Sequence, residues 1–351
     1  MTTSSIKQAK KISQLFFGFM SSIIRTEIRE FFKLAIPLAS AQVAQSATGF
    51  ADTVMMGRLG AEALGAGGLA SLTFFALLNT TTGAVMGVSP LVAEAYGGGH
   101  KTRIEQLASQ GFWLSVVLAI PMMILIGHLG LLMGQLGQAA TTVTMAKSYL
   151  DVMLWGFFPA LGFAMLRGFV SALSQARPVM VIVIAGTLFN IAGNYVLGFG
   201  KFGFPKMGLA GLALSSTISL WGMFLALVVY TLKHKQLKTY RLFQELHRVK
   251  PRILWELLVI GLPIGVSSAL EVGLFTVVTY LMGILGTDVL AAHQIVFQTI
   301  VVIFMVPLGM SFATTARVGQ LNGQQNREGV RLAGYVSMII GAAFMSIMMI
   351  G

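Results

Sequence analysis

Long apolar runs alternate with short polar segments along the whole chain. Each run reaches the ~20 residues that an α-helix needs to cross the hydrocarbon of a bilayer. We therefore predict nine membrane-spanning helices joined by polar turns. The runs cover residues 34–56, 63–93, 107–132, 146–173, 178–200, 208–232, 254–284, 289–315 and 330–351. Tilts or kinks are expected at the prolines inside these runs, Pro37, Pro121, Pro159, Pro263 and Pro307.

Composition supports a polytopic membrane protein of the all-α class. The chain is 56% hydrophobic and only 10% charged, with a mean hydropathy of +0.80. Soluble domains carry about 25% charged residues, so a soluble fold is excluded. There is no cysteine, which rules out disulfides, thiolate metal sites and cysteine nucleophiles. No Walker A loop and no HExxH motif occurs either, so neither ATP-driven pumping nor enzymatic activity is expected.

Basic residues are distributed unevenly between the two sides of the predicted bundle. The N-terminal tail and the even-numbered loops hold about 20 of the 24 Lys and Arg residues, and the loop KHKQLKTYRLFQELHRVKPR alone supplies seven. The other side holds only Arg58, Lys147, Lys201 and Lys206. Because basic loops stay in the cytoplasm, we expect a multi-pass plasma (inner) membrane protein with a cytoplasmic N-terminus. This bias explains the net charge of +12 without nucleic acid as a partner.

The N-terminal segment 1–33 does not resemble a cleavable signal. Basic residues are scattered among short apolar patches, and no small-residue cleavage site follows. We interpret it as a basic amphipathic segment on the cytoplasmic membrane surface, with a disordered tail as the alternative.

An internal repeat relates two parts of the chain. Residues 30–112 align with residues 256–338 at a constant offset of 226, without a gap. The offset superimposes the turns MGRLGAEALGA and MGILGTDVLAA, and it also superimposes two prolines and the basic loops GGGHKTR and GQQNREG. Chance similarity between apolar segments does not readily place prolines, turns and loops in one register, so we interpret the alignment as a true repeat.

The repeat predicts two bundles of six helices. An even number of spans gives both copies the same orientation, related by a pseudo-twofold axis along the membrane normal with a cavity between them. We expect an N-lobe at 34–232, a basic linker at 233–253 and a C-lobe at 254–351. Gly351 is the counterpart of Leu125 in the third span, so the sequence is expected to be a fragment or truncated form of a twelve-span protein, with nine spans present.

Two acids lie deep inside predicted spans. Asp52 is in the outer half of the first span, and Glu271 lies about 15 residues into the seventh. Acids inside spans usually face a cavity and mark a path for ions or protons, although a hydrogen bond between helices is the alternative. The repeat counterpart of Asp52 is Val278, and that of Glu271 is Gln45. The two bundles therefore carry their polar groups at different places.

Polar residues in other spans offer partners for these acids. Asn190 and Asn194 are four residues apart, which puts both amides on one helix face. With the Asp52 carboxylate they supply hard oxygen ligands for Na⁺, or acceptors for a protonated acid. Interhelical hydrogen bonding is the alternative role for both asparagines. Four further residues are expected to line a substrate cavity: Gln42, Gln45, His293 and Gln294.

Several separated motifs resemble one transporter family. The stretch LAIPLASAQVAQSATGFADTVMMGRLGAEALGA is similar to the first span and loop of the MATE (multidrug and toxic compound extrusion) transporters. GTLFNIAGNYVLGFGKFGFPKMGLAGLALSSTISLW resembles the fifth and sixth helices of that family. GLPIGVSSALEVGLF and LAAHQIV resemble its NorM-type branch. The resemblance covers residues 30–351.

The resemblance implies a twelve-helix, two-lobe antiporter that uses Na⁺ or H⁺ to expel small organic cations, without another cofactor. By position, Asp52, Asn190 and Asn194 fall on the N-lobe cation site, and Glu271 falls on the acid of the C-lobe site. The family's acidic partner in the tenth helix is absent from this sequence. We expect alternating access in a lipid bilayer, by a monomer when complete. Two alternatives stay open: a flippase of lipid-linked oligosaccharides from the same superfamily, and a truncated membrane protein that is inactive alone.

Overall fold

The computed structural model describes residues 3–135, 139–240, 242, 248–284 and 287–350, and throughout these ranges the elements are helices. Side chains are described from Ile24 onward, apart from some positions between 280 and 295. The α-helices are α1 (Thr3–Leu59), α2 (Ala61–Val85), α3 (Val88–Gly97), α4 (Lys101–Gln135), α5 (Ala140–Met153), α6 (Phe157–Ala172), α7 (Ala176–Gly193), α8 (Gly208–Lys233), α9 (Pro251–Ile284), α10 (Thr287–Gly323) and α11 (Arg327–Ile350). Three short helical turns complete them, η1 (Leu154–Gly156), η2 (Asn194–Gly198) and η3 (Leu237–Thr239).

Eight helical segments of the described chain are long and apolar enough to cross a membrane. Three of them combine consecutive elements: α2 with α3, α5 with η1 and α6, and α7 with η2. The expected all-α polytopic fold is thus confirmed. The first predicted span, 34–56, is helical but is not among the eight, because polar side chains such as Gln42 and Asp52 interrupt its apolar sequence. It nevertheless packs within the bundle, between α7 and α10.

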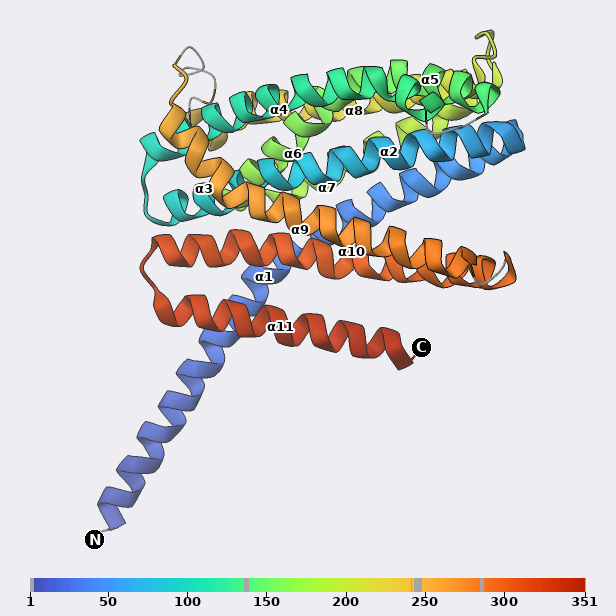
Figure 1. Ribbon diagram of the computed structural model, residues 1–351. Helices are drawn as coiled ribbons and strands as arrows, with labels where there is room; N and C mark the ends of the chain where they lie inside the picture. The colour runs from blue at the N-terminus through green and yellow to red at the C-terminus, as the bar shows by residue number, and fades with distance from the viewer. Residues whose placement is uncertain (1–2, 136–138, 241, 243–247, 285–286, 351) are drawn as a thin grey trace.

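Helix α1 is longer than the predicted span. It continues without a break across the predicted boundary between residues 33 and 34, and through Pro37. Its N-terminal part projects away from the bundle (Figure 1). Proline costs a helix one backbone hydrogen bond. In a membrane helix that loss can be offset by packing against neighbours, and around Pro37 the buried residues Leu34, Ala35 and Leu38 supply such packing.

Close contacts between the two repeats occur in pairs that are related by the offset of 226 residues. A Cβ atom on Gly83 of α2 would overlap the backbone of Gly265 in α9. Shifted by the offset, this pair becomes Gly309 of α10 and Ala39 of α1, and a Cβ on Gly309 would indeed overlap Ala39. Glycine permits such close backbone approach between membrane helices. The packing of α2 on α9 and of α1 on α10 is therefore pseudo-symmetric, as a parallel repeat requires.

A second pair repeats the pattern near one end of the bundle. A Cβ on Gly97 would overlap the carbonyl of Gln320, and a Cβ on Gly323 would overlap the carbonyl of Glu94. The offset of 226 residues relates Gly97 to Gly323 and Glu94 to Gln320, so it converts the first of these contacts into the second. The turns at 98–100, 173–175 and 324–326 and the described linker segments 234–240 and 248–250 lie at this end, which we call the basic end.

Polar contacts join the two repeats at the basic end. Arg317 of α10 donates from Nε and Nη2 to the two carboxylate oxygens of Glu27 in α1, each over 2.7 Å. Arg103 of α4 pairs with Glu256 of α9. These ion pairs tie the two repeats together at the basic end. At the opposite end, the α1–α2 turn and the end of α9 are separated in the view of Figure 1.

Candidate functional site

A ladder of polar side chains joins α1 to α7 inside the bundle. On α1, Thr48 and Asp52 are four residues apart, and on α7 Thr187 and Asn190 are three apart, so each pair lies on one helix face. The two faces meet because α1 packs along α7. Thr48 and Thr187 share a hydrogen bond of 2.9 Å between their hydroxyls, and Thr187 also donates to the carbonyl of Ala44 over 3.2 Å. This pair fixes the register of the two helices one turn before the acid.

The side chain of Asp52 is hydrogen-bonded to that of Asn194. Nδ2 of Asn194 donates to Oδ1 of Asp52 over 2.5 Å. Both residues are buried, with exposed fractions of 6% for Asp52 and 0% for Asn194. A buried carboxylate is costly unless it is neutralised by a proton or a cation, and a single neutral amide does not provide either. In this geometry the negative charge of the Asp52 carboxylate is therefore left to be balanced by a bound proton or cation.

Asn190 connects the contact between Asp52 and Asn194 to α8 through hydrogen bonds. Its Oδ1 accepts from Nδ2 of Asn194 over 3.2 Å, and its own Nδ2 donates to Oγ of Ser216 over 2.9 Å. Ser215 Oγ donates to the backbone carbonyl of Asn190 over 2.9 Å. The orientation of both amides is thus set by a chain of hydrogen bonds from α8 through α7 to Asp52.

The side-chain oxygen of Asn194 has no hydrogen-bond partner among the described residues, although it is buried. Buried polar atoms nearly always have a partner, so an orphan of this kind calls for an explanation such as a bound ion or water. Amide and carboxylate oxygens are the ligands of hard cations. Asn194 also begins the π-helical turn η2. Single π-helical turns inside α-helices occur frequently at functional sites.

The surroundings of Asp52 are otherwise apolar or neutral. The buried phenol of Tyr149 in α5 lies within electrostatic range of the carboxylate. In the described part of the chain, no three His, Cys, Asp or Glu side chains are grouped so that they could hold a metal ion. The oxygen donors near Asp52 are its carboxylate and the neighbouring amide oxygen of Asn194, which suit a hard monovalent cation or a proton better than a transition metal.

Gln42 belongs to a different contact, at a buried arginine. Arg167 of α6 donates from Nη1 to Oε1 of Gln42 over 2.8 Å. Its guanidinium carbon lies 5.1 Å from the ring centroid of Phe312 in α10. Arg167 is 8% exposed, and no described acid forms an ion pair with it. The cation is therefore held by a carbonyl oxygen and an aromatic face that belong to different repeats.

The other predicted residues do not join the Asp52 group. Glu271 is exposed on α9, which packs against α2, α4 and α10. Gln45 is exposed on α1. His293 shares a 3.2 Å hydrogen bond between Nε2 and Oγ1 of Thr279, and its ring stacks on Phe297. The side chain of Gln294 lies outside the described residues.

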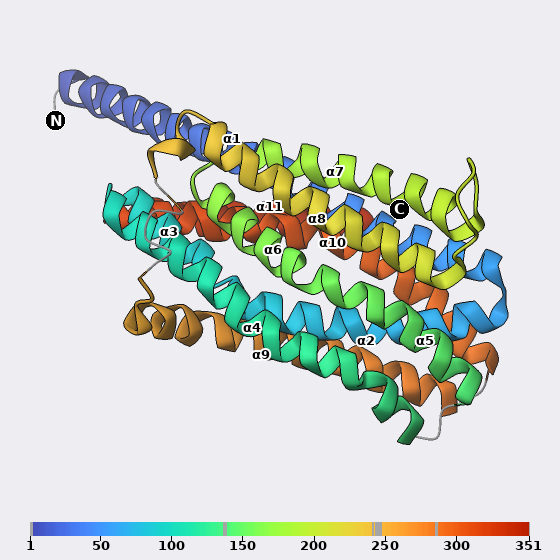
Figure 2. The same cartoon turned by 90° about the horizontal axis from the view of Figure 1, so that it is seen from above.

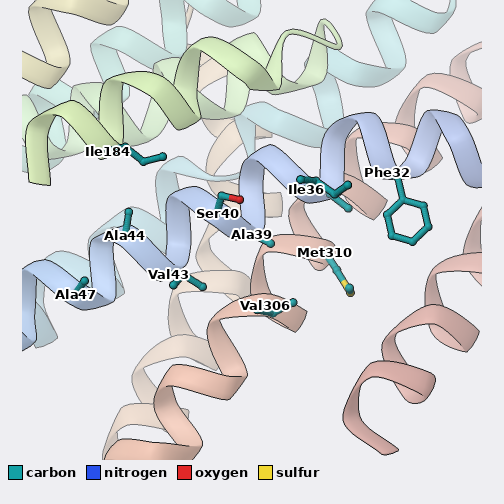
Figure 3. Close-up of a pocket in the computed structure, with 11 residues that line it drawn as sticks. Phe32, Ile36, Ala39, Ser40, Val43, Ala44, Ala47, Ile184, Val306 and Met310 are labelled. Carbon is teal, nitrogen blue, oxygen red and sulfur yellow. The ribbon is translucent and has the colours of Figure 1, made fainter. Parts of the chain in front are cut away.

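An apolar pocket of about 440 Å³ lies along α1, between α7 and α10 (Figure 3). Ser40 contributes the one hydroxyl among side chains that are otherwise aliphatic, aromatic or thioether. Its other lining residues are Phe32, Ala35, Ile36, Ala39, Val43, Ala44, Ala47, Ile184, Val306 and Met310. The residues expected to line a substrate cavity are not among these, so the pocket is distinct from the prediction.

Sequence reasoning missed several members of these contacts. Thr187 precedes Asn190 by three residues, and Thr48 precedes Asp52 by four, so helical spacing around the predicted residues was an available signal. Arg167 could have been found as a charged residue within the run 146–173. The serines of α8 had no such signal, because serine is common in membrane helices.

Comparison with known proteins gives one consistent result. The MatE family model matches residues 37–196 and 263–351. A Synechocystis protein named "Probable multidrug resistance protein NorM" is 57% identical over 322 residues, which cover 92% of this chain and 70% of that protein. A Photobacterium profundum protein named "Multidrug resistance protein NorM" is 33% identical over 317 residues, covering 90% of this chain and 70% of that protein.

Solved structures share the fold at low sequence identity. A MATE protein in the straight conformation has a TM-score of 0.82 and 23% identity, and the match covers 91% of this chain and 70% of that one. An outward-facing MATE family transporter of the MOP superfamily has a TM-score of 0.80 and 22% identity, with 90% and 69% covered. These likenesses concern the helical arrangement.

Proposed function

The chain belongs to the MatE family of membrane transporters, and on this premise we propose that it is a multidrug efflux antiporter that exchanges Na⁺ or H⁺ for organic cations. The observation that carries the proposal is the buried Asp52, which accepts a hydrogen bond from Asn194, while the oxygen of that amide has no partner among the described residues. The name of the NorM relatives supports the efflux of several drugs.

Coupling follows from competition for one negative charge. A coupling cation neutralises Asp52 and uses the free oxygen of Asn194, whereas a proton neutralises the same carboxylate and turns it into a donor for amide oxygens. Either event removes the charge that attracts a cationic drug. Because two cations weaken each other's binding at one anionic site, the loading of the ion drives release of the drug.

The ion pairs at the basic end support an alternating-access cycle. Arg317–Glu27 and Arg103–Glu256 hold the repeats together at this end, while at the opposite end the α1–α2 turn and the end of α9 are separated in the view of Figure 1. With a cytoplasmic N-terminus, as the basic loops favour, this arrangement is the outward-open state. Opening to the cytoplasm then requires these ion pairs to separate as the two lobes, 34–232 and 254–351, rock against each other.

Glu271 is proposed as the acid of a second coupling position in the C-lobe. Its counterpart in the first repeat is Gln45, so the two lobes are not equivalent in charge. Its exposure on α9, away from Asp52, fits a site that acts separately from the first.

Dye efflux with independent ion gradients tests the proposal. Cells that express the protein are loaded with a cationic dye, and the Na⁺ gradient and the pH gradient are varied one at a time. We expect efflux to follow one of the two gradients and to stop when that gradient is collapsed. Efflux that continues unchanged without either gradient would contradict an antiport mechanism.

A further inference from the structure

The loop 199–207 exposes two large aromatic side chains at the end of the bundle opposite the basic end. It joins η2 to α8, and both neighbouring helical segments are candidate membrane spans. Phe202 is 84% exposed and Phe204 is 53% exposed. The loop extends sideways past the neighbouring helices in both views, at the end of α7 and α8 (Figures 1 and 2).

Phe202 occupies a backbone position that disfavours it. The N–H of Phe204 donates to the carbonyl of Lys201 over 3.2 Å, which closes a four-residue turn. The two central residues have positive φ angles, 56° for Phe202 and 85° for Gly203, the combination found in type I′ turns. Gly203 adopts this conformation freely, but a bulky residue rarely does. Glycine, asparagine or aspartate would suit both the backbone and water better, so folding does not explain this phenylalanine.

The base of the loop is fixed, so the exposure of Phe202 is built into the structure. The N–H of Lys201 donates to the carbonyl of Val196 over 3.0 Å, and the N–H of Met207 donates to the carbonyl of Leu197 over 3.1 Å. A Cβ on Gly200 would lie only 2.7 Å from the backbone nitrogen of Lys206, so the two sides of the loop are in contact there. The tip is thus held out from the bundle.

Two lysines flank the aromatic tip. Lys201 and Lys206 are exposed, and neither forms an ion pair with a described residue. The sequence contains no acid between Asp151 and Glu245, so the loop and both of its helices are locally positive. Lysines near the ends of membrane helices extend their ammonium groups to the headgroups, and exposed phenylalanines beside them can bury their rings at the boundary with the acyl chains.

We propose that the loop 199–207 is a membrane-interface anchor that binds anionic lipid headgroups. Phe202 and Phe204 insert between the lipids of the leaflet at this end, and Lys201 and Lys206 contact headgroup phosphates. The strained turn directs the ring of Phe202 toward the bilayer. Because the base of the loop is fixed, the anchored loop sets the position of η2 and α8 relative to the membrane surface. The proposal does not depend on the coupling ion or on the substrate.

A reporter placed in the loop tests the proposal, and the absence of native cysteine makes single labelling simple. The full chain with Phe204→Cys carries an NBD fluorophore and is reconstituted into phosphatidylcholine vesicles with or without phosphatidylglycerol. Thr141→Cys, exposed at the start of α5 at the same end, is the matched control. We expect shallow doxyl lipids to quench the Phe204 reporter and aqueous iodide to quench it several-fold less than the Thr141 reporter. Equal iodide quenching of both positions would overturn the proposal.

Two further variants separate the aromatic and the charged contributions. Phe202→Asn keeps the turn conformation, and it is expected to move the Phe204 reporter toward water. Lys201→Gln together with Lys206→Gln is expected to abolish the added protection that phosphatidylglycerol gives. Protection from iodide without doxyl quenching would mean that protein covers the loop, either a second copy or the rest of the bundle, and would refute the lipid anchor. An unchanged melting temperature in detergent shows that each variant is folded.

Discussion

Asn194 donates one hydrogen bond to Asp52 over 2.5 Å, while its own side-chain oxygen remains buried and without a described partner. One amide therefore both positions the acid and offers an unused ligand beside it. A buried oxygen left without a partner costs about 1–3 kcal/mol, which a cation bound beside Asp52 would recover. This arrangement is the observation on which the proposed site between α1 and α7 rests.

Replacement of Asn194 by alanine is expected to abolish efflux. It removes the donor that positions Asp52 and the free oxygen beside it, and it lowers the free energy of unfolding by about 1–3 kcal/mol. Dye efflux and unfolding in mixed micelles measure the two effects. Thr187→Val is the control, because it removes the two hydrogen bonds of Thr187 to α1, each at a typical cost of about 0.6 kcal/mol. Loss of efflux in the control as well would assign Asn194 a packing role only.

Replacement of Gly309 by valine is expected to separate α10 from α1. A Cβ at this position already overlaps the backbone of Ala39, so the helices must shift. Overpacking of this kind costs about 1–3 kcal/mol. Gly341→Val is the matched control, since nothing lies within 4 Å of a Cβ there. Equal thermal stabilities of the two variants in detergent would contradict the close contact.

The Arg167–Phe312 contact is expected to show energetic coupling. Phe312→Leu should lower the unfolding free energy by about 1–2 kcal/mol more in the native background than in an Arg167→Gln background, because the aromatic face stabilises a desolvated cation. A double-mutant cycle in mixed micelles measures this difference. A coupling energy near zero would mean that Gln42 alone accommodates the guanidinium.

Much of the architecture could be predicted from the sequence. Apolar runs predicted the spans and the offset of 226 residues predicted the repeat, whereas the paired contacts of Gly83 with Gly265 and of Gly309 with Ala39 became apparent only in the structure. The meeting of Asp52 with Asn194 followed from an acid in one span and two asparagines at helical spacing in another.

Other features depend on tertiary packing and could not be predicted from the sequence. The unbroken course of α1 through residue 34 depends on neighbours that compensate for Pro37. The π-helical turn at Asn194 and the contact of Arg167 with Phe312 join segments whose relative rotation hydropathy does not specify. The separation of Glu271 from Asp52 likewise depends on the packing of α9 against α2.

The most direct test of the account is dye efflux by Asp52→Asn. This substitution keeps the size of the side chain but removes its charge, so the bundle should fold while the site can no longer exchange one cation for another. Thr53→Val, on an exposed neighbouring position of α1, is the control and should retain efflux. With both proteins present in the membrane at equal amounts, the account predicts that Asp52→Asn lacks gradient-driven efflux. Efflux at the native rate in Asp52→Asn would contradict it.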